Sequence, residues 1–237
     1  MAIATFAIGI SKTGISGLGI IGIAIFTMAV PAKQSTGLVL PLLVSADICA
    51  VLFYRRVVVW KHLIGLFPWA AVGIFLGYLT LGRVNGDHIG QLIGAILLVM
   101  GVIQVVRKRR PSGEDSRHSK ILTGLMGMLA GFTTMVANAA GPVMSLYLLW
   151  MGLPKNEFIG TGAWYYMIVN TFKLPFSANL GLINHQSLLI DAVLLPLIVI
   201  GAIIGRLIVA RINQQLFENL ILALTFLAAA RLLIPVG

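Results

Sequence analysis

The stretch GISKTGISGLG, residues 9–19, interrupts an otherwise apolar segment near the start of the chain. That segment, 2–30, would measure about 45 Å as one helix, which exceeds the ~30 Å hydrocarbon core of a bilayer. Glycine and serine loosen a helix, and irregular backbone at membrane depth is tolerated only where protein or a water-filled cavity covers it. We therefore predict two half-helices that meet inside the membrane, in preference to one long kinked helix.

A second long apolar segment, 121–151, is interrupted in the same way by TTMVANAAGP, residues 133–142. Asparagine and glycine loosen the helix there, and proline removes a backbone donor. Other apolar stretches have the length of single membrane helices, because about 20 residues at 1.5 Å each cross the hydrocarbon core. They are 35–54, 63–82, 89–106, 157–178, 187–210 and 214–234.

The composition agrees with a membrane protein. The 237 residues are 59% hydrophobic and only 10% charged, whereas soluble chains are about 25% charged. A net charge of +10 would suggest nucleic-acid binding in a soluble protein, but short basic loops on the cytoplasmic side account for it. No basic surface interleaved with aromatic residues accompanies the charge, so we expect no nucleic-acid partner.

Part of the sequence occurs twice in similar form, and this internal repeat predicts two related halves. In a membrane protein such a duplication is typical of a secondary transporter, with the site at the interface between the halves. A hydrophilic, basic segment lies between the two copies. The matched positions are Pro31, Gly37 and Asp47 with Pro154, Gly160 and Asn170, and Gly77, Arg83 and Asn85 with Gly205, Arg211 and Asn213.

The distribution of charge favours one topology. If each broken pair returns to the side from which it entered, each half makes three crossings, and most basic residues collect on one face, as the positive-inside rule prefers. An odd number of crossings inverts the second half relative to the first. We thus predict an all-α polytopic membrane protein with two inverted-topology repeats, each a broken, re-entrant helix pair plus three transmembrane helices. The first repeat is 1–106, the basic cytoplasmic connector is 107–120, and the second repeat is 121–237.

Ionisable side chains inside a membrane span are costly and are therefore functional candidates. Lys12 lies in the first break, and Asp47 and Lys173 lie in apolar spans. Two cations and one carboxylate leave one uncompensated positive charge, which suits an anion. We predict that Lys12 and Lys173 bind the substrate. Asp47 either couples transport to an ion or forms a structural ion pair, and Asn170, its counterpart in the second repeat, lines the interface between the halves.

Half-helix N-termini supply backbone N–H groups and the positive end of a dipole to an anion. Glycine lets a ligand approach that backbone, and hydroxyl and amide side chains add donors. Trp164 either lines the pathway or faces lipid as an interfacial aromatic. The remaining predicted substrate-binding residues are Ser11, Thr13, Gly14, Ser16, Gly17, Asn138, Gly141 and Trp164. We expect no metal ion and no cofactor.

The chain resembles the TauE/SafE family of sulfite and organosulfonate exporters, also called the toluene sulfonate uptake permease family. The resemblance implies a multi-pass transporter of small sulfur-containing anions in the plasma membrane, the bacterial inner membrane, coupled to a proton or sodium gradient. It extends over both halves. The motifs that carry it are Ser11-Lys12-Thr13-Gly14, Pro31 with Lys33 and Gly37, Gly77 with Arg83 and Asn85, Ala137–Pro142, Leu153-Pro154-Lys155 and Gly160–Trp164.

Two other classes of protein remain as alternatives. An anion channel would need a continuous polar path or a ring of subunits. An intramembrane hydrolase is suggested by Gly14-Ile15-Ser16-Gly17, which resembles the Gly-x-Ser-Gly motif of rhomboid proteases, but that chemistry needs a histidine beside the serine. The four histidines lie at the edges of spans or in loops, namely His62, His88, His118 and His185.

Overall fold

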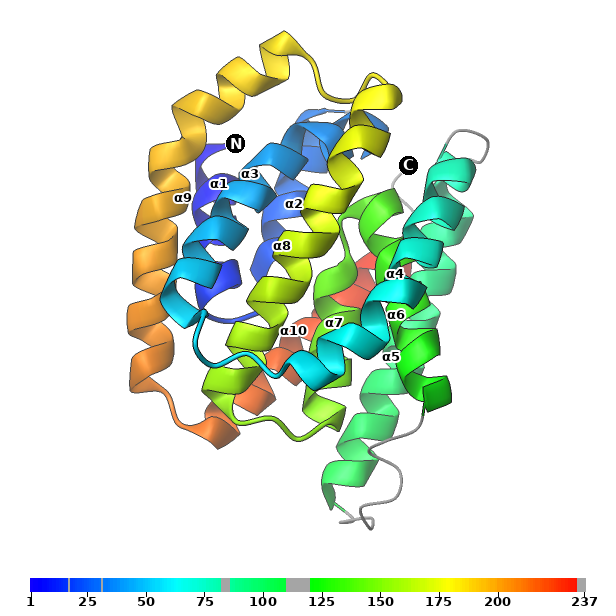
Figure 1. Ribbon diagram of the computed structural model, residues 1–237, viewed down its shortest axis with the longest axis vertical. Helices are drawn as coiled ribbons and strands as arrows, with labels where there is room; N and C mark the ends of the chain where they lie inside the picture. The colour runs from blue at the N-terminus through cyan, green and yellow to red at the C-terminus, as the bar shows by residue number, and fades with distance from the viewer. Residues whose placement is uncertain (17, 31, 82–85, 110–119, 234–237) are drawn as a thin grey trace.

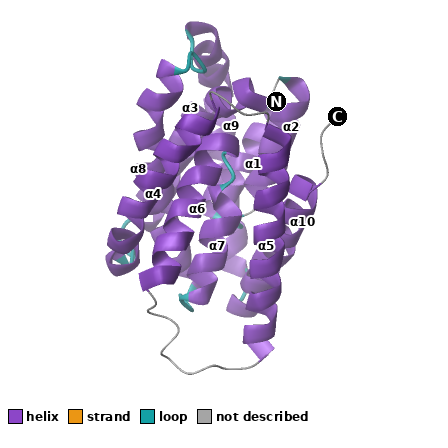
Figure 2. Cartoon of the chain, turned by 90° about the vertical axis from the view of Figure 1, so that its right-hand side faces the viewer, coloured by secondary structure: helices purple, strands orange, loops and turns teal. Residues whose placement is uncertain are grey.

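The structure, a computed structural model of the chain, describes residues 1–16, 18–30, 32–81, 86–109 and 120–233. Within these ranges the chain is helical, with ten α-helices joined by short connections (Figures 1 and 2). The helices are α1 (Ala2–Thr13), α2 (Leu18–Ala29), α3 (Ala32–Tyr54), α4 (Trp60–Leu81), α5 (Gly86–Arg109), α6 (Lys120–Ala137), α7 (Ala140–Trp150), α8 (Lys155–Asn179), α9 (His185–Arg211) and α10 (Gln214–Leu233).

Both long apolar segments are broken where the sequence predicts. The first ends its initial helix at Thr13 and resumes at Leu18, and the second stops at Ala137 and resumes at Ala140. Asn138, between the latter two helices, has a φ of 52°, in the left-handed region that asparagine tolerates better than most residues. The local chemistry of glycine and asparagine therefore sets both interruptions.

Each broken pair folds back on itself as a hairpin. In the first pair, a Cβ added at Gly19 would lie 3.1 Å from the Ser11 hydroxyl, and one added at Gly22 would lie 2.7 Å from the Ala4 carbonyl. Later residues of α2 therefore lie beside earlier residues of α1, so the two helices run antiparallel. In the second pair, the Tyr147 hydroxyl near the end of α7 lies 3.5 Å from the Thr123 hydroxyl near the start of α6.

The hairpins are held by close helix packing on glycine. The most extensive contacts join α4 to α6 and α1 to α9. On α9, a Cβ at Gly205 would lie 2.6 Å from the Thr13 hydroxyl, and Gly201 similarly lies against the backbone of α1. On α4, a Cβ at Gly77 would lie 2.8 Å from the Met135 side chain of α6. Small residues allow such backbone approach in membranes, where dispersion contacts drive helix association.

The helical architecture and its apolar surface agree with a polytopic membrane protein. Among the described residues, four helices are long and apolar enough to cross a bilayer, namely Lys33–Tyr54, Trp60–Leu81, Lys120–Ala137 and His185–Arg211. The other predicted spans form α5, α8 and α10, with 24, 25 and 20 residues. Many large apolar side chains are exposed on the outside, as on α4 and α9, which is the expected surface for contact with lipid.

Part of the predicted connector lies outside the described residues, and so do several residues that the sequence analysis names. Of 107–120, the described part is helical, because α5 continues to Arg109 and α6 begins at Lys120. Gly17, Pro31, Arg83 and Asn85 lie outside the described ranges. The connections α3–α4, α7–α8 and α9–α10 lie toward the lower end of the molecule in Figure 1, and the N-terminus lies toward the upper end.

Candidate anion site at the helix breaks

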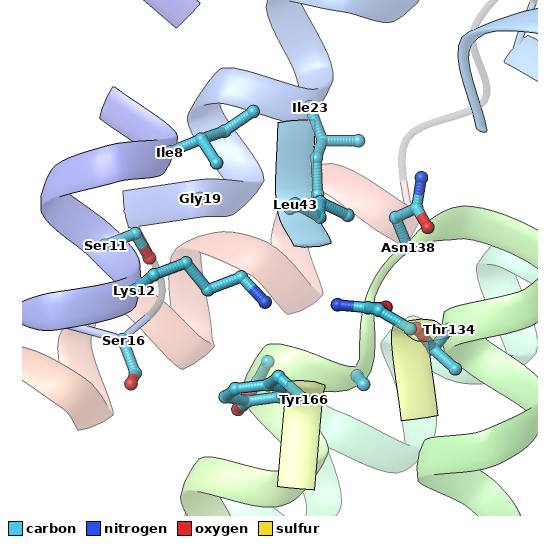
Figure 3. A pocket seen from close by; sticks show the side chains of 13 residues that line it. Ile8, Ser11, Lys12, Ser16, Gly19, Ile23, Leu43, Thr134, Asn138 and Tyr166 are labelled. Atoms are coloured by element: carbon cyan, nitrogen blue, oxygen red, sulfur yellow. The ribbon is translucent and has the colours of Figure 1, made fainter. Parts of the chain in front are cut away.

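A cavity of about 40 Å³ that opens at one side lies where the two breaks face each other across α3 and α8 (Figure 3). The hairpin breaks bring loop backbone and polar side chains to a depth that continuous helices would fill with apolar residues. Side chains and backbone from six helices, α1, α2, α3, α6, α7 and α8, and from both breaks meet there. The polar and small residues of the wall are Ser11, Lys12, Ser16, Gly19, Thr134, Asn138, Ala140, Gly141, Tyr166 and Asn170.

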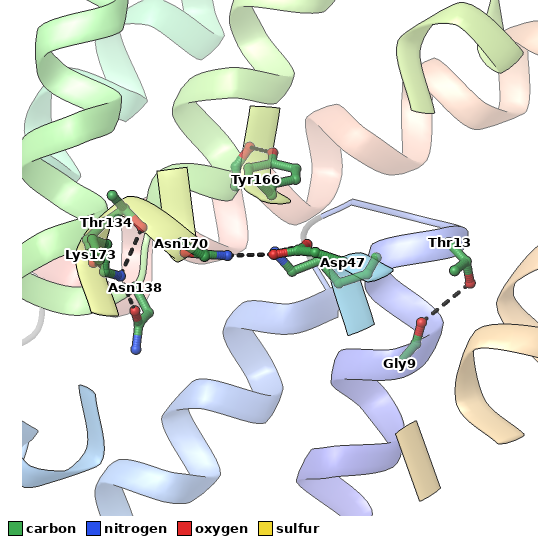
Figure 4. Close-up of polar contacts among 10 residues, drawn as sticks. Gly9, Thr13, Asp47, Thr134, Asn138, Tyr166, Asn170 and Lys173 are labelled. Carbon is green, nitrogen blue, oxygen red and sulfur yellow. Dashed lines mark hydrogen bonds and ion pairs between the residues drawn. The ribbon is translucent and has the colours of Figure 1, made fainter. Parts of the chain in front are cut away.

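Lys12 forms the charged wall of the cavity. Its ammonium lies 2.8 Å from Asp47 Oδ1, in an ion pair whose side chains are 12% and 0% exposed. Asn170 Nδ2 donates to the other carboxylate oxygen of Asp47 at 2.6 Å (Figure 4). The Tyr166 ring lies under the Lys12 ammonium, 4.2 Å from its centroid, a cation–π distance. The carboxylate is thus fully buried, and its cation lies at the boundary of the cavity.

Lys173 is differently placed, because its ammonium is already occupied. Its side chain is 1% exposed, and Nζ donates to the Thr134 carbonyl at 2.6 Å, the Thr134 hydroxyl at 3.2 Å and Asn138 Oδ1 at 2.5 Å (Figure 4). A lysine ammonium has three N–H donors. Lys173 therefore neutralises the C-terminal end of α6 and holds the break, as expected for a cation near a helix C-terminus.

Asn138 connects three elements at the second break. It accepts from Lys173 of α8, and its Nδ2 donates to the Thr36 carbonyl in the first turns of α3 at 3.0 Å. Its positive φ turns the chain so that α7 begins at the cavity. The Tyr166 hydroxyl donates to the Gly141 carbonyl at 3.3 Å. A Cβ added at Gly141 would have no neighbour within 4 Å, so the start of α7 is open to a ligand.

The N-termini of two half-helices face the cavity. Gly19 belongs to the first turn of α2, and Ala140 and Gly141 belong to the first turn of α7. The first N–H groups of a helix have no intrahelical partner and carry the positive end of the helix dipole. Together with Lys12, they give the cavity the character of an anion site.

The structure brings some of the predicted substrate-binding residues to the cavity and leaves others away from it. Lining the cavity are Ser11, Lys12, Ser16, Asn138, Gly141 and Asn170. Thr13 donates to the Ala202 carbonyl at 2.6 Å, and Gly14 packs on the Gly205 backbone, so both hold α1 against α9. Trp164 packs on Trp60, with ring centroids 5.2 Å apart, and is not among the described residues that line the cavity.

Tyr166 is a wall residue that the sequence reasoning missed. A tyrosine within a membrane span is ordinarily interpreted as a packing residue of the core. Its hydroxyl group bonds to the Gly141 carbonyl, which is 25 residues away in the sequence. One signal could have found it. Tyr166, Asn170 and Lys173 are spaced four and three residues apart, so they share one face of α8. Among the described residues, no group of three histidine, cysteine, aspartate or glutamate side chains is placed to hold a metal ion.

We expect Lys173→Met to lower the thermal stability of the purified protein rather than its intrinsic anion affinity. The change leaves Asn138 Oδ1 buried without its donor, while the Thr134 carbonyl keeps only the hydrogen bond from the Asn138 backbone N–H. An unsatisfied buried group costs about 1–3 kcal/mol. Thermal melting and calorimetric titration with an anion are the two measurements. A variant with normal melting and no anion binding would make Lys173 a ligand instead.

Broken helices that meet at a buried, cationic cavity define a class, the polytopic membrane transport proteins. The chain belongs to the family described as Sulfite exporter TauE/SafE, whose model matches residues 1–232 of the 237. This membership identifies a multi-pass membrane protein of a family that exports sulfite. Searches among curated proteins and among solved structures gave no match.

Proposed function

We propose that the chain moves a small sulfur-containing anion across the bacterial inner membrane as a secondary transporter, by alternating access and at the expense of an ion gradient. The substrate class is sulfite or an organosulfonate such as sulfoacetate, in line with the family description. The observation that carries the proposal is the Lys12 ammonium, which faces a cavity toward which two helix N-termini point.

The hydrogen-bond donors that line the cavity suit a sulfur oxyanion. A sulfonate presents three acceptor oxygens, so it requires donors from several directions. Lys12 supplies a charged donor, the first turns of α2 and α7 supply backbone N–H groups, and Ser11 and Ser16 add hydroxyls. Ile8, Ile23 and Leu43 also line the cavity, and these side chains would contact the short alkyl part of an organosulfonate.

The proposed two-fold relation between inverted repeats is supported by one contact. Asp47 and Asn170, which the duplication aligns, touch each other at 2.6 Å. Equivalent positions of two repeats contact each other only near the symmetry axis that relates them. The cross-packing agrees, since the first helix of each hairpin packs on the second span of the other half, as α1 on α9 and α6 on α4. We propose that the axis passes through the site, as in transporters with inverted repeats.

The proposed orientation places the basic connections in the cytoplasm. Arg55 and Arg56 lie at the α3–α4 connection, Lys155 begins α8, and Arg211 ends α9. These connections share the lower end of the molecule in Figure 1, which the positive-inside rule assigns to the cytoplasm. The lipid bilayer and a coupling proton or sodium ion are the other partners that the proposal requires.

Thermal stabilisation of the purified protein tests substrate class. A ligand that binds only the folded state at 100 times its Kd stabilises it by about 2.7 kcal/mol. We expect sulfite, thiosulfate and sulfoacetate to raise the melting temperature, and acetate and taurine to do so less, because acetate has two oxygens and taurine carries a second, positive charge. Equal stabilisation by all these compounds, or by none, would contradict the proposal.

Flux measurements separate a transporter from a channel. In proteoliposomes we expect uptake of the stabilising anion that saturates with concentration and depends on an imposed ion gradient. A current that rises linearly with voltage and does not saturate would favour the channel. Protein-free liposomes and the double variant Lys12→Met with Asp47→Asn serve as controls.

A further inference from the structure

The Lys12 ammonium, which a bound anion would need as its cation, is already paired with the Asp47 carboxylate. Among the described residues, the cavity has two lysine ammonium groups near it, and that of Lys173 already donates to Thr134 and Asn138. Lys12 is left as the available cation, with Asp47 Oδ1 2.8 Å away as its partner. An incoming anion and the Asp47 carboxylate therefore compete for one ammonium group.

Both negative charges cannot remain there without a large repulsion. Two oxygens that accept from the same ammonium lie about 5 Å apart, given N···O distances near 2.8 Å. Asp47 is fully buried, so water and salt screen this repulsion poorly. The repulsion disappears when Asp47 binds a proton, and the protonated carboxyl then has an O–H with which it can donate to the anion.

The surroundings of Asp47 point to a proton as its partner. The groups facing the carboxylate are Lys12 of α1 and Asn170, Tyr166 and Lys173 of α8. The helix α2 has no titratable side chain, and α9 directs Arg206 onto Phe53, at 4.8 Å, instead. A metal cation would need several oxygen ligands, whereas the amide nitrogen of Asn170 and the Lys12 ammonium surround this carboxylate.

We propose that the anion replaces Asp47 at the Lys12 ammonium and that Asp47 takes up one proton from the cavity water in the same step. The proposal rests on the proposed function and names its coupling ion. Proton and anion then load together and leave together, because release of the anion returns Lys12 to Asp47 and the proton to water. Thermodynamic reciprocity requires each ligand to raise the affinity for the other.

Calorimetric titration with thiosulfate tests this directly in the purified full-length protein. Thiosulfate keeps its charge from about pH 5 to about pH 8, so a proton taken up belongs to the protein. Titrations in two buffers of different ionisation enthalpy give the number of protons bound per anion. We expect one proton per anion, and an apparent affinity that falls about tenfold per pH unit where Asp47 is ionised in the free protein.

Two variants locate the proton. Asp47→Asn imitates the protonated carboxyl, so we expect thiosulfate binding that is independent of pH and at least as tight as that of the parent at low pH. Asp191→Asn is the matched control, because Asp191 is another buried carboxylate, on α9, with no hydrogen-bond partner among the described residues. It lies about 16 Å along α9 from Ala202, which contacts Thr13 beside Lys12. We expect it to keep the parent's pH dependence.

The outcomes separate this inference from the proposed function. Thiosulfate binding to the parent protein without proton uptake overturns the proton coupling and leaves the anion site in place. Loss of the pH dependence in Asp191→Asn, but not in Asp47→Asn, also overturns it. If none of the anions in the stabilisation panel binds the parent protein, the proposed function itself fails. The parent titration decides the matter even if a variant does not fold.

Discussion

A folded double variant, Lys12→Met with Asp47→Asn, is expected to bind the anion at least about 100-fold more weakly than the single variant Asp47→Asn. Charge-assisted hydrogen bonds contribute about 1.5–3 kcal/mol each, and a 100-fold loss corresponds to about 2.7 kcal/mol. The comparison is made on the Asp47→Asn background for a physical reason. Removing Lys12 alone would leave the fully buried Asp47 carboxylate without its cation, which costs about 3–5 kcal/mol.

Calorimetric titration measures the loss, and thermal melting confirms that the double variant is folded. The matched control is Lys33→Met on the same background, because Lys33 is an exposed lysine in the first turn of α3 and does not line the cavity. It removes the same net charge and should leave the affinity unchanged. Equal losses in the two variants would mean that overall positive charge attracts the anion and that Lys12 has no specific contact with it.

Much of the fold could be predicted from the sequence because membrane helices obey simple limits of length and polarity. The predicted span 35–54 corresponds to Ala32–Tyr54, and 187–210 corresponds to His185–Arg211. The breaks were also predictable, since the chemistry of glycine, asparagine and proline acts locally. The inverted relation between the halves stays a proposal, supported by the contact between Asp47 and Asn170.

The partners of individual polar side chains could not be predicted in the same way. Lys12 and Thr13 are neighbours in the chain, but successive helical residues point about 100° apart. Lys12 therefore faces the cavity, whereas Thr13 bonds to Ala202, far away in the sequence. Both lysines looked suited to an anion, and only the tertiary structure shows that the Lys173 ammonium already donates to Thr134 and Asn138, whereas Lys12 lines the cavity.

The same substitution at two glycines is expected to have opposite consequences. In Gly131→Ala, the new methyl group would overlap the Ala70 carbonyl, where α6 packs against α4. Backbone atoms at such a contact cannot turn aside, so the helices must separate, and we expect a loss of stability of about 3 kcal/mol or more. The measurements are the yield of monodisperse protein and its melting temperature.

In Gly141→Ala, by contrast, the new methyl group has no neighbour within 4 Å and enters the space of the cavity. We expect normal or slightly raised stability, because alanine is favoured over glycine in a helix by up to about 1 kcal/mol. Anion affinity should fall about tenfold, since the methyl group blocks approach to the start of α7, and calorimetric titration measures this. If Gly141→Ala bound every anion of the panel as tightly as the parent, the substrate would not approach the α7 backbone. Recognition would then rest on Lys12 and the first hairpin, and the two breaks would be unequal in function despite their similar sequence chemistry.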